Sequence, residues 1–273
     1  MRRFLHSRHL WSAASLLLAS MLLMHNALAA EQNSVTGTPP AKPRGPSCNR
    51  ATFTTVIDVG HTAEAPGALS ARGVYEYEFN LRLAKQIEKG LRVAGFERTV
   101  LMITAGMDRA GLFMRAVRAN ELAADLFLSI HHDAVPERFL ETWQFEGQER
   151  HFSDRFPGHS IFISNNNADH DGSLLFARLL GNALKAQGMQ YASHYTEEFM
   201  GDRRRELVDA HAGVYLYNEL IVLKETHMPA VLLEAGSIVN RREELLLATP
   251  ERQAIISAAV VAAVESFCGR QDQ

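Results

Sequence analysis

The chain has 273 residues, of which 47% are apolar and 22% carry a charged side chain, and its formal net charge is -3. This length and composition are those of a globular protein that buries its own core, and they exclude an intrinsically disordered chain. The small acidic excess also argues against a protein that binds nucleic acid by neutralising phosphates, so we expect no nucleic-acid partner.

The first 29 residues are predicted to be a signal peptide. Arg2, Arg3 and Arg8 precede an apolar run over residues 10–24, and Ala27-Leu28-Ala29 then forms a small-x-small cleavage pattern. The alternative is a membrane anchor, but this run is shorter than the roughly 20 residues that cross a bilayer. The paired arginines leave open whether export uses the general or the twin-arginine route. Cleavage leaves 25 basic and 31 acidic residues, so we expect an acidic exported protein with no membrane contact.

A linker, one domain and a short tail are predicted to follow the signal peptide. Residues 30–50 are rich in proline, residues 51–269 form the domain, and 270–273 are the tail. Cys48 and Cys268 lie near the two ends of the domain. Because paired cysteines of exported proteins tend to oxidise, we expect a disulfide between them. Two unpaired thiols are the alternative, since sequence does not establish proximity.

Strand-like and helix-like segments alternate along the predicted domain. The predicted strands cover residues 54–59, 99–103, 126–130, 160–164 and 230–233. The predicted helices cover residues 74–94, 112–124, 173–187 and 250–267, with Gly95 after the first and Thr249-Pro250 opening the last. This order predicts an α/β fold, a single domain with a central, mainly parallel twisted sheet flanked by helices. Two polar stretches, 134–159 and 193–214, are interpreted as loops with short helices.

Polar side chains follow three of the predicted strands. His61 follows the first, His131 and His132 follow the third, and Glu234 follows the last. Ligands of open α/β sheets bind beyond the carboxyl ends of the strands, so parallel strands would bring these groups to one crevice. Two histidines and a carboxylate suit a catalytic zinc ion, with Glu76 the best third ligand and Glu234 the candidate proton carrier. Taken singly, each residue is more often structural; only the joint pattern points to a metal site.

Four motifs occur in a fixed order along the domain. They are Ile57-Asp58-Val59-Gly60-His61; Gly73-Val74-Tyr75-Glu76 with Asn80-Leu81; Arg115 and Ala119-Asn120 with the run from Ala124 to Ser129-Ile130-His131; and Pro229 to Glu234 with Gly236 and Asn240. In this order they resemble the motifs of the zinc-dependent N-acetylmuramoyl-L-alanine amidases of the cell-division type. The register of the resemblance selects Glu76 over Glu78 and His131 over His132. The chain departs from the family pattern at Thr62-Ala63-Glu64, Thr104-Ala105, His132-Asp133 and Gly236-Ser237, and none of these departures removes a proposed ligand or the catalytic acid.

The resemblance implies a peptidoglycan hydrolase that cleaves the amide between N-acetylmuramic acid and the L-alanine of the stem peptide by zinc-activated water. His61, Glu76 and His131 would bind one zinc ion (Zn2+) per chain, and Glu234 would be the catalytic residue. The implied partner is peptidoglycan, a protein activator is a further candidate, and we expect a periplasmic monomer. The alternatives are another zinc amidase or peptidase on the same scaffold, or a non-catalytic wall-binding relative.

A regulatory segment is a further hypothesis. Residues 193–212 precede the strand that carries Glu234 and contain the acidic residues Glu197, Glu198, Asp202, Glu206 and Asp209. By position the segment resembles the occluding helix of some division amidases, in which an acidic side chain takes the open metal position. The alternative is a solvated surface loop.

Overall fold

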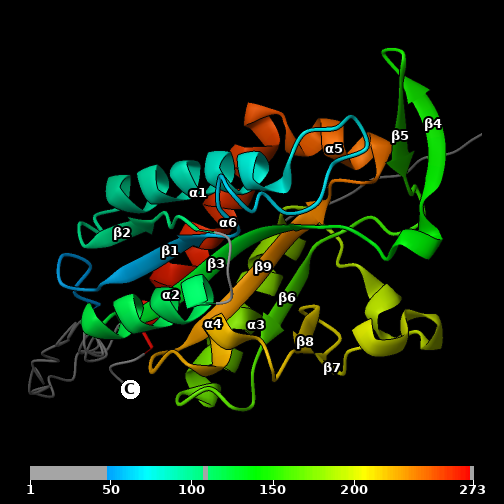
Figure 1. Ribbon diagram of the computed structural model, residues 1–273. Helices are drawn as coiled ribbons and strands as arrows, with labels where there is room; N and C mark the ends of the chain where they lie inside the picture. The colour runs from blue at the N-terminus through cyan, green and yellow to red at the C-terminus, as the bar shows by residue number, and fades with distance from the viewer. Residues whose placement is uncertain (1–47, 107–109, 271–273) are drawn as a thin grey trace, which may run out of the picture. The chain divides into compact units, whose positions relative to one another are not determined.

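The computed structural model describes residues 48–106 and 110–270 (Figure 1). The predicted signal peptide, nearly all of the predicted linker and residues 271–273 lie outside the described residues. Their boundaries therefore remain predictions.

The described chain alternates strands and helices as the sequence predicts. The strands are β1 Thr55–Val59, β2 Thr99–Met102, β3 Leu126–Asp133, β4 Glu141–Phe145, β5 Gln148–Phe152, β6 Ser160–Ile163, β7 Leu207–Asp209, β8 Val214–Leu216 and β9 Ala230–Ser237. The helices are α1 Glu76–Val93, α2 Ala110–Glu121, α3 His170–Ala186, α4 Ile221–Lys224, α5 Arg241–Leu247 and α6 Pro250–Cys268, and the 3₁₀ helices are η1 Glu137–Phe139, η2 Ser193–Thr196 and η3 Glu198–Arg203. Every predicted strand and helix is present, with ends that differ by a few residues.

A seven-stranded sheet in the order β2-β1-β3-β9-β6-β8-β7 forms the centre of the fold (Figure 1). Strands β2, β1, β3 and β9 are mutually parallel, β6 runs antiparallel to β9, and β8 is parallel to β6. Helices α1, α3 and α6 cover one face of the sheet, and α2 and α4 cover the other. Successive residues of β3 point to opposite faces, which explains why Leu126 and Leu128 join one core and Phe127 the other. The predicted mainly parallel α/β sheet is confirmed.

The helix ends follow the predicted capping residues. Gly95 adopts a φ of 91° directly after the end of α1, a backbone conformation that glycine accepts without steric cost. The Thr249 side chain accepts a hydrogen bond from the backbone nitrogen of Arg252, and Pro250 occupies the first turn of α6. Local sequence therefore fixes where these two helices end and begin.

The interpretation of residues 134–159 as a loop with short helices is wrong in part, because the stretch contains the short helix η1 but also two strands. Strands β4 and β5 form an antiparallel hairpin there, separate from the main sheet and projecting from the body of the domain (Figure 1). Glu146 and Gly147 connect the strands with φ values of 51° and 75°, the left-handed pair of a tight hairpin turn. In the second polar stretch, β7 and the start of β8 extend the main sheet beside η2 and η3.

The predicted disulfide between Cys48 and Cys268 is present. The two Cα atoms lie 5.1 Å apart and 220 residues separate the cysteines along the chain. The bond ties the first described residue to the end of α6, whose side chains pack in the core against α1 and α3.

Replacing both cysteines by serine is expected to lower the free energy of unfolding by up to about 5 kcal/mol, because the bond restricts a very long loop in the unfolded chain. Denaturant unfolding of the oxidised protein and of the Cys48→Ser/Cys268→Ser variant measures this difference. An unchanged midpoint would show that the bond contributes nothing to stability.

His159, directly before β6, makes the stability of the fold depend on pH. Its side chain is 1% exposed, and neither ring nitrogen has a hydrogen-bond partner among the described residues. Burial lowers the pKa of His159 to about 4, against about 6.5 for an unfolded chain. Between these values the unfolded state binds a proton that the folded state rejects. Above pH 6.5 protonation of His159 does not affect the free energy of unfolding. As the pH falls from 6.5 towards 4, this free energy decreases by about 1.4 kcal/mol per pH unit.

We expect His159→Gln to reduce this pH dependence. The experiment compares unfolding free energies of both proteins at pH 7 and pH 4.5 with a chelator present, so that release of metal does not contribute. His132 and His194, which are also buried, remain in both proteins and cancel in the comparison. Equal slopes for the two proteins would refute the assignment.

No single helix within the described residues combines the length and apolar character needed to cross a membrane. Helices α5 and α6 meet that description only as a pair, and they are bent by 73° relative to each other.

Candidate active site

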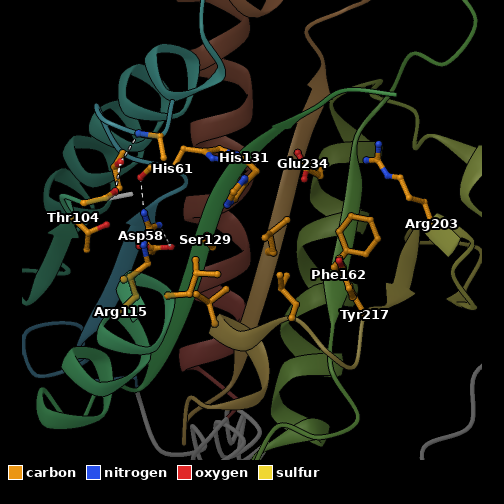
Figure 2. A pocket seen from close by; sticks show the side chains of 18 of the residues that line it. Asp58, His61, Thr104, Arg115, Ser129, His131, Phe162, Arg203, Tyr217 and Glu234 are labelled. Atoms are coloured by element: carbon orange, nitrogen blue, oxygen red, sulfur yellow. Dashed lines mark hydrogen bonds and ion pairs between the residues drawn. The ribbon is translucent and has the colours of Figure 1, made fainter. Parts of the chain in front are cut away.

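His61, Glu76 and His131 meet beside the carboxyl ends of β1 and β3. Nε2 of His61 lies 2.9 Å from Oε2 of Glu76, and Nδ1 of His131 lies 3.0 Å from Oε1. The three side chains each offer a ligand atom within 4.8 Å of the others, and both histidines line a cavity (Figure 2). The structure thus brings together the three residues that the sequence selects as metal ligands. Two imidazoles and one carboxylate with an open side are a donor set that fits a catalytic zinc ion.

Tight backbone packing places the two histidines. His61 has a φ of 66°, a left-handed conformation that residues other than glycine rarely adopt and that is often found at functional sites. A side chain at Gly60 would overlap the ring of His131. Gly67, with a φ of 78°, packs so closely that an added Cβ would lie 2.6 Å from Glu76 Oε2. Gly60 and Gly67 therefore leave room for the donor group.

Glu76 is held from several directions at the start of α1. Its Oε1 accepts hydrogen bonds from the Asn80 amide at 3.2 Å and from the backbone nitrogen of His132 at 3.3 Å. Burial raises the pKa of the Glu76 carboxyl, but hydrogen bonds and charges from His131 and His61 outweigh burial and hold that pKa well below its usual range. Glu76 is therefore a fixed, ionised carboxylate, which a metal ligand needs to be.

The side chain of His132 points to the face of β3 opposite the cavity and packs in the core. Its Nδ1 is 2.8 Å from Oδ1 of Asn80, and its ring packs on Phe79. Burial lowers the pKa of His132 to about 3. Asn80 thus links the helix, the ligand Glu76 and β3, which explains the asparagine that follows Glu76 by four residues in the second motif.

A buried ion pair supports the loop that carries His61. Arg115 of α2 donates to both carboxylate oxygens of Asp58 at 3.1 Å and to the carbonyl of Val59 at 2.7 Å, and it also donates to the carbonyl of His61. Ser129 donates to Asp58 at 2.7 Å. The polar residues of the first and third motifs therefore form one network beneath the metal-ligand group (Figure 2).

Glu234 lies next to His131 across the sheet. The two residues are register partners on the parallel strands β3 and β9, and β9 extends past the predicted end at 233 to include Glu234. Oε2 of Glu234 has no hydrogen-bond partner among the described residues, and the side chain lines the cavity. Burial raises the pKa of Glu234 well above its usual value, and the negative charges of Asp133 and Glu76 raise it further. A carboxyl group with a raised pKa at the wall of a cavity is suited to take up and release a proton.

Asp133, Tyr195 and Arg203 lie near Glu234, and sequence reasoning did not single out Tyr195 or Arg203. The Tyr195 hydroxyl donates to Oδ2 of Asp133 at 2.7 Å, and Arg203 lies 3.5 Å from Oδ1 of the same carboxylate. Burial raises the pKa of Asp133 to about 6, and the positive charge of Arg203 opposes that rise. Figure 2 shows Glu234 between His131 on one side and Arg203 on the other. A departure from the family pattern at Asp133 was the one sequence signal at this position.

The cavity in front of these residues has a volume of about 560 Å³. Its polar lining includes His61, His131, Glu234, Arg203 and Arg205, and its apolar lining includes Phe162. The volume is in the range of small-molecule and peptide sites.

The occluding role suggested for residues 193–212 does not match this structure. Glu197, Glu198, Asp202 and Glu206 are exposed to solvent, and Asp209 pairs with Arg178 at 2.7 Å. No acidic side chain of this segment belongs to the metal-ligand group, which consists of His61, Glu76 and His131 in the described part of the chain. The segment instead contributes Tyr195, Arg203 and Arg205 to the cavity wall.

A sequence model of the N-acetylmuramoyl-L-alanine amidase family, amidase 3, matches residues 55–266. The chain belongs to this amidase family. Among curated relatives it is 24% identical over 261 residues to the N-acetylmuramoyl-L-alanine amidase AmiA of Salmonella typhimurium, covering 89% of this chain and 86% of that protein. It is 22% identical over 211 residues to a putative N-acetylmuramoyl-L-alanine amidase of Buchnera aphidicola, covering 77% of this chain and 94% of that protein.

Solved amidase structures have the same fold as this family member. The amidase Ami1 of Mycobacterium smegmatis matches with a TM-score of 0.61 at 19% identity, covering 82% of this chain and 99% of that one. The CwlD amidase of Clostridioides difficile, solved in complex with the GerS lipoprotein, matches with a TM-score of 0.57 at 18% identity, covering 79% of this chain and 98% of that one. At these identities the likeness concerns the fold.

Proposed function

We propose that this family member is an exported, periplasmic amidase that cleaves the bond between N-acetylmuramic acid and the L-alanine of the stem peptide in peptidoglycan. The observation that carries the proposal is the meeting of His61, Glu76 and His131 with Glu234 at the wall of one cavity. The family match and the amidase fold support the substrate class.

His61, Glu76 and His131 would hold one zinc ion per chain. The ionised carboxylate of Glu76 lies between the two imidazoles, and both histidines face the cavity. When bound, zinc activates a water molecule and polarises the amide carbonyl. Asn80 and the Asp58–Arg115 pair keep the ligands in position, as residues behind a metal site commonly do.

Glu234 would take the proton of the attacking water and deliver it to the leaving amine. Its unpartnered oxygen lies at the cavity, beside His131, and its raised pKa suits a group that both accepts and donates a proton. Arg203 lies on the side of Glu234 opposite His131 (Figure 2). Its positive charge would reduce the electrostatic repulsion among the carboxylates of Glu234, Asp133 and Glu76.

Two features of the chain indicate where the protein acts. The predicted signal peptide and the Cys48–Cys268 bond support an exported protein of an oxidising compartment, and we place it in the periplasm as a monomer that acts on the cell wall during division. A protein activator is part of this proposal. The complex of the CwlD amidase with a lipoprotein offers a precedent for such a partner.

The decisive experiment is digestion of purified peptidoglycan sacculi with the zinc-loaded protein, with and without a chelator, followed by mass analysis of the soluble products. We expect stem peptides with a free L-alanine amine and glycan strands with a free lactyl carboxylate, and we expect the chelator to abolish both. Cleavage within the peptide would instead identify a zinc peptidase on this scaffold. Wall binding without cleavage by the zinc-loaded protein would identify a non-catalytic relative.

A further inference from the structure

We propose that Arg205 is a binding residue for a free carboxylate on the peptide half of the substrate, and that the peptide therefore runs from Glu234 along the sheet towards Tyr217. The inference rests on the proposed function and adds to it a substrate requirement and a direction across the cavity.

Arg205 carries a positive charge that the protein does not neutralise. No carboxylate lies within 4.0 Å of its guanidinium in the described part of the chain, although the same segment has acidic residues at Asp202 and Glu206. Arg203, its neighbour in the cavity wall, does have a carboxylate partner in Asp133. A guanidinium that lines a cavity without an anionic partner is a binding group for an anion from outside.

The guanidinium of Arg205 is held in place before any ligand binds. It stacks over the ring of Tyr217 with 4.0 Å between its carbon and the ring centroid. Its Nη1 donates to the backbone carbonyls of Asp202 at 2.7 Å and Arg204 at 2.8 Å. Its Nε is buried and therefore out of reach of a ligand, whereas Nη2 is not buried and makes no hydrogen bond with the described residues. A fixed guanidinium with a free donor binds a carboxylate at a lower entropy cost than a mobile one.

An apolar strip connects the catalytic end of the cavity with Arg205. Leu232 lies two residues before Glu234 on β9 and pairs with Phe162 on β6, and Tyr217 follows β8 on the next strand. Figure 2 shows Phe162 between Glu234 and Tyr217. Glu234 pairs with Ser160 and Leu216 pairs with Ile163, so Tyr217 lies two strands away from Glu234 and about four residues further along the sheet. With strands about 4.8 Å apart and a rise of about 3.3 Å per residue, the two backbone positions are on the order of 16 Å apart. The Glu234 and Arg205 side chains both line the cavity, so the gap between their charged ends is shorter and spans a few residues of extended peptide.

These features define the ligand. A peptide with a small apolar residue at the scissile amide would cover the strip formed by Leu232 and Phe162. A free carboxylate two or three residues further on would reach Arg205. The carboxylate can belong to an acidic side chain or to the chain end, since the guanidinium recognises both in the same way.

The test uses synthetic N-acetylmuramoyl tripeptides whose side-chain and terminal carboxylates are free, singly amidated or both amidated. For the zinc-loaded protein we expect amidation of one of these positions to lower kcat/KM by about 10- to 100-fold, the range of a charge-assisted hydrogen bond. Whichever amidation has this effect identifies the source of the carboxylate. Arg205→Gln is expected to lower kcat/KM for the free-acid substrate by the same factor. It is expected to leave kcat/KM for the amidated substrate nearly unchanged.

Two further variants control the comparison. Arg205→Lys is expected to recover part of the lost activity, because the charge returns without the planar donor pair. Arg204→Gln, which removes an exposed guanidinium that donates to the carbonyl of Thr196 outside the cavity, is expected to leave kcat/KM unchanged. An equal loss on acid and amide substrates, or no loss for Arg205→Gln, would overturn the carboxylate site.

A binding measurement separates this inference from the proposed function. Calorimetry with the zinc-loaded Glu234→Gln protein and the free-acid tripeptide reports affinity without turnover. The site is supported if adding Arg205→Gln weakens binding of the acid about 10-fold or more and leaves binding of the amide unchanged, even where no substrate is cleaved. It is refuted if the acid and the amide each bind with the same affinity whether or not Arg205→Gln is present. Hydrolysis that is absent for every substrate counts against the proposed function alone.

Discussion

Glu234→Gln is expected to lower the rate of amide hydrolysis by about 10²–10⁴-fold while zinc stays bound. Glutamine keeps the size of the side chain but neither accepts a proton from water nor returns one to the leaving amine. The residue is not among the three side chains that converge as metal ligands, so metal content should not change. The measurement is turnover on sacculi together with the zinc content of the same preparation.

Glu78→Gln is the matched control for this experiment. Glu78 is an exposed acid on α1, close in sequence to Glu76, and its side chain faces solvent. We expect turnover and zinc content of the control to equal those of the unmodified protein. Near-normal turnover of Glu234→Gln would remove this residue from the reaction, and a loss of zinc would indicate that it is a ligand.

The residues that carry the proposed chemistry could be identified from sequence because they stand in short segments with fixed local geometry. His61 ends a strand, Glu76 begins a helix, and His131 and Glu234 sit on β3 and β9. Parallel pairing of β1, β3 and β9 then brings these residues to one edge of the sheet. The resemblance to the family's third motif selects His131 over His132 as the metal ligand. The structure gives its physical reason, since alternate residues of a strand point to opposite faces.

The rest of the site depends on contacts that no local pattern encodes. Tyr195 and Arg203 reach Asp133 from a segment 62 or more residues away in sequence, so their approach is fixed only when β6 and β8 join the sheet. The same holds for residues 193–212. Their acidic composition suggested a lid, yet the fold turns these acids to solvent and the arginines towards the cavity. Composition gives the charges of a segment but not the side from which they approach a site.

The hairpin of β4 and β5 was missed for a different reason. Its strands are short and mostly exposed, so the alternation of apolar residues that marks a half-buried strand is weak. The turn at Glu146-Gly147 has glycine at only one of its two left-handed positions, a fainter signal than Asn-Gly. Trp143 and Phe152 contact the distant Arg241, and such long-range contacts help to hold the hairpin against the domain.

His61→Ala and His131→Ala are each expected to weaken zinc binding by more than about 100-fold and to abolish hydrolysis. Removal of residues behind a metal ligand typically costs about 10- to 100-fold in affinity, and loss of a ligand itself should exceed that range. Asn80→Ala, which leaves all three ligands in place but frees Glu76 from a 3.2 Å hydrogen bond, should fall within it. Zinc affinity measured by competition with a coloured chelator gives the order of the three variants.

Circular dichroism and the unfolding midpoint establish that each variant is folded, and His211→Ala provides the control. His211 is exposed and contacts Lys185 at 3.1 Å, away from the metal-ligand group. Removing it should leave zinc affinity unchanged. If His61→Ala or His131→Ala keeps one zinc per chain at the original affinity, that histidine is not a ligand. A graded series, with Asn80→Ala between His211→Ala and the two ligand variants, is the pattern expected when Glu76 must be held in position to share the ion with two imidazoles.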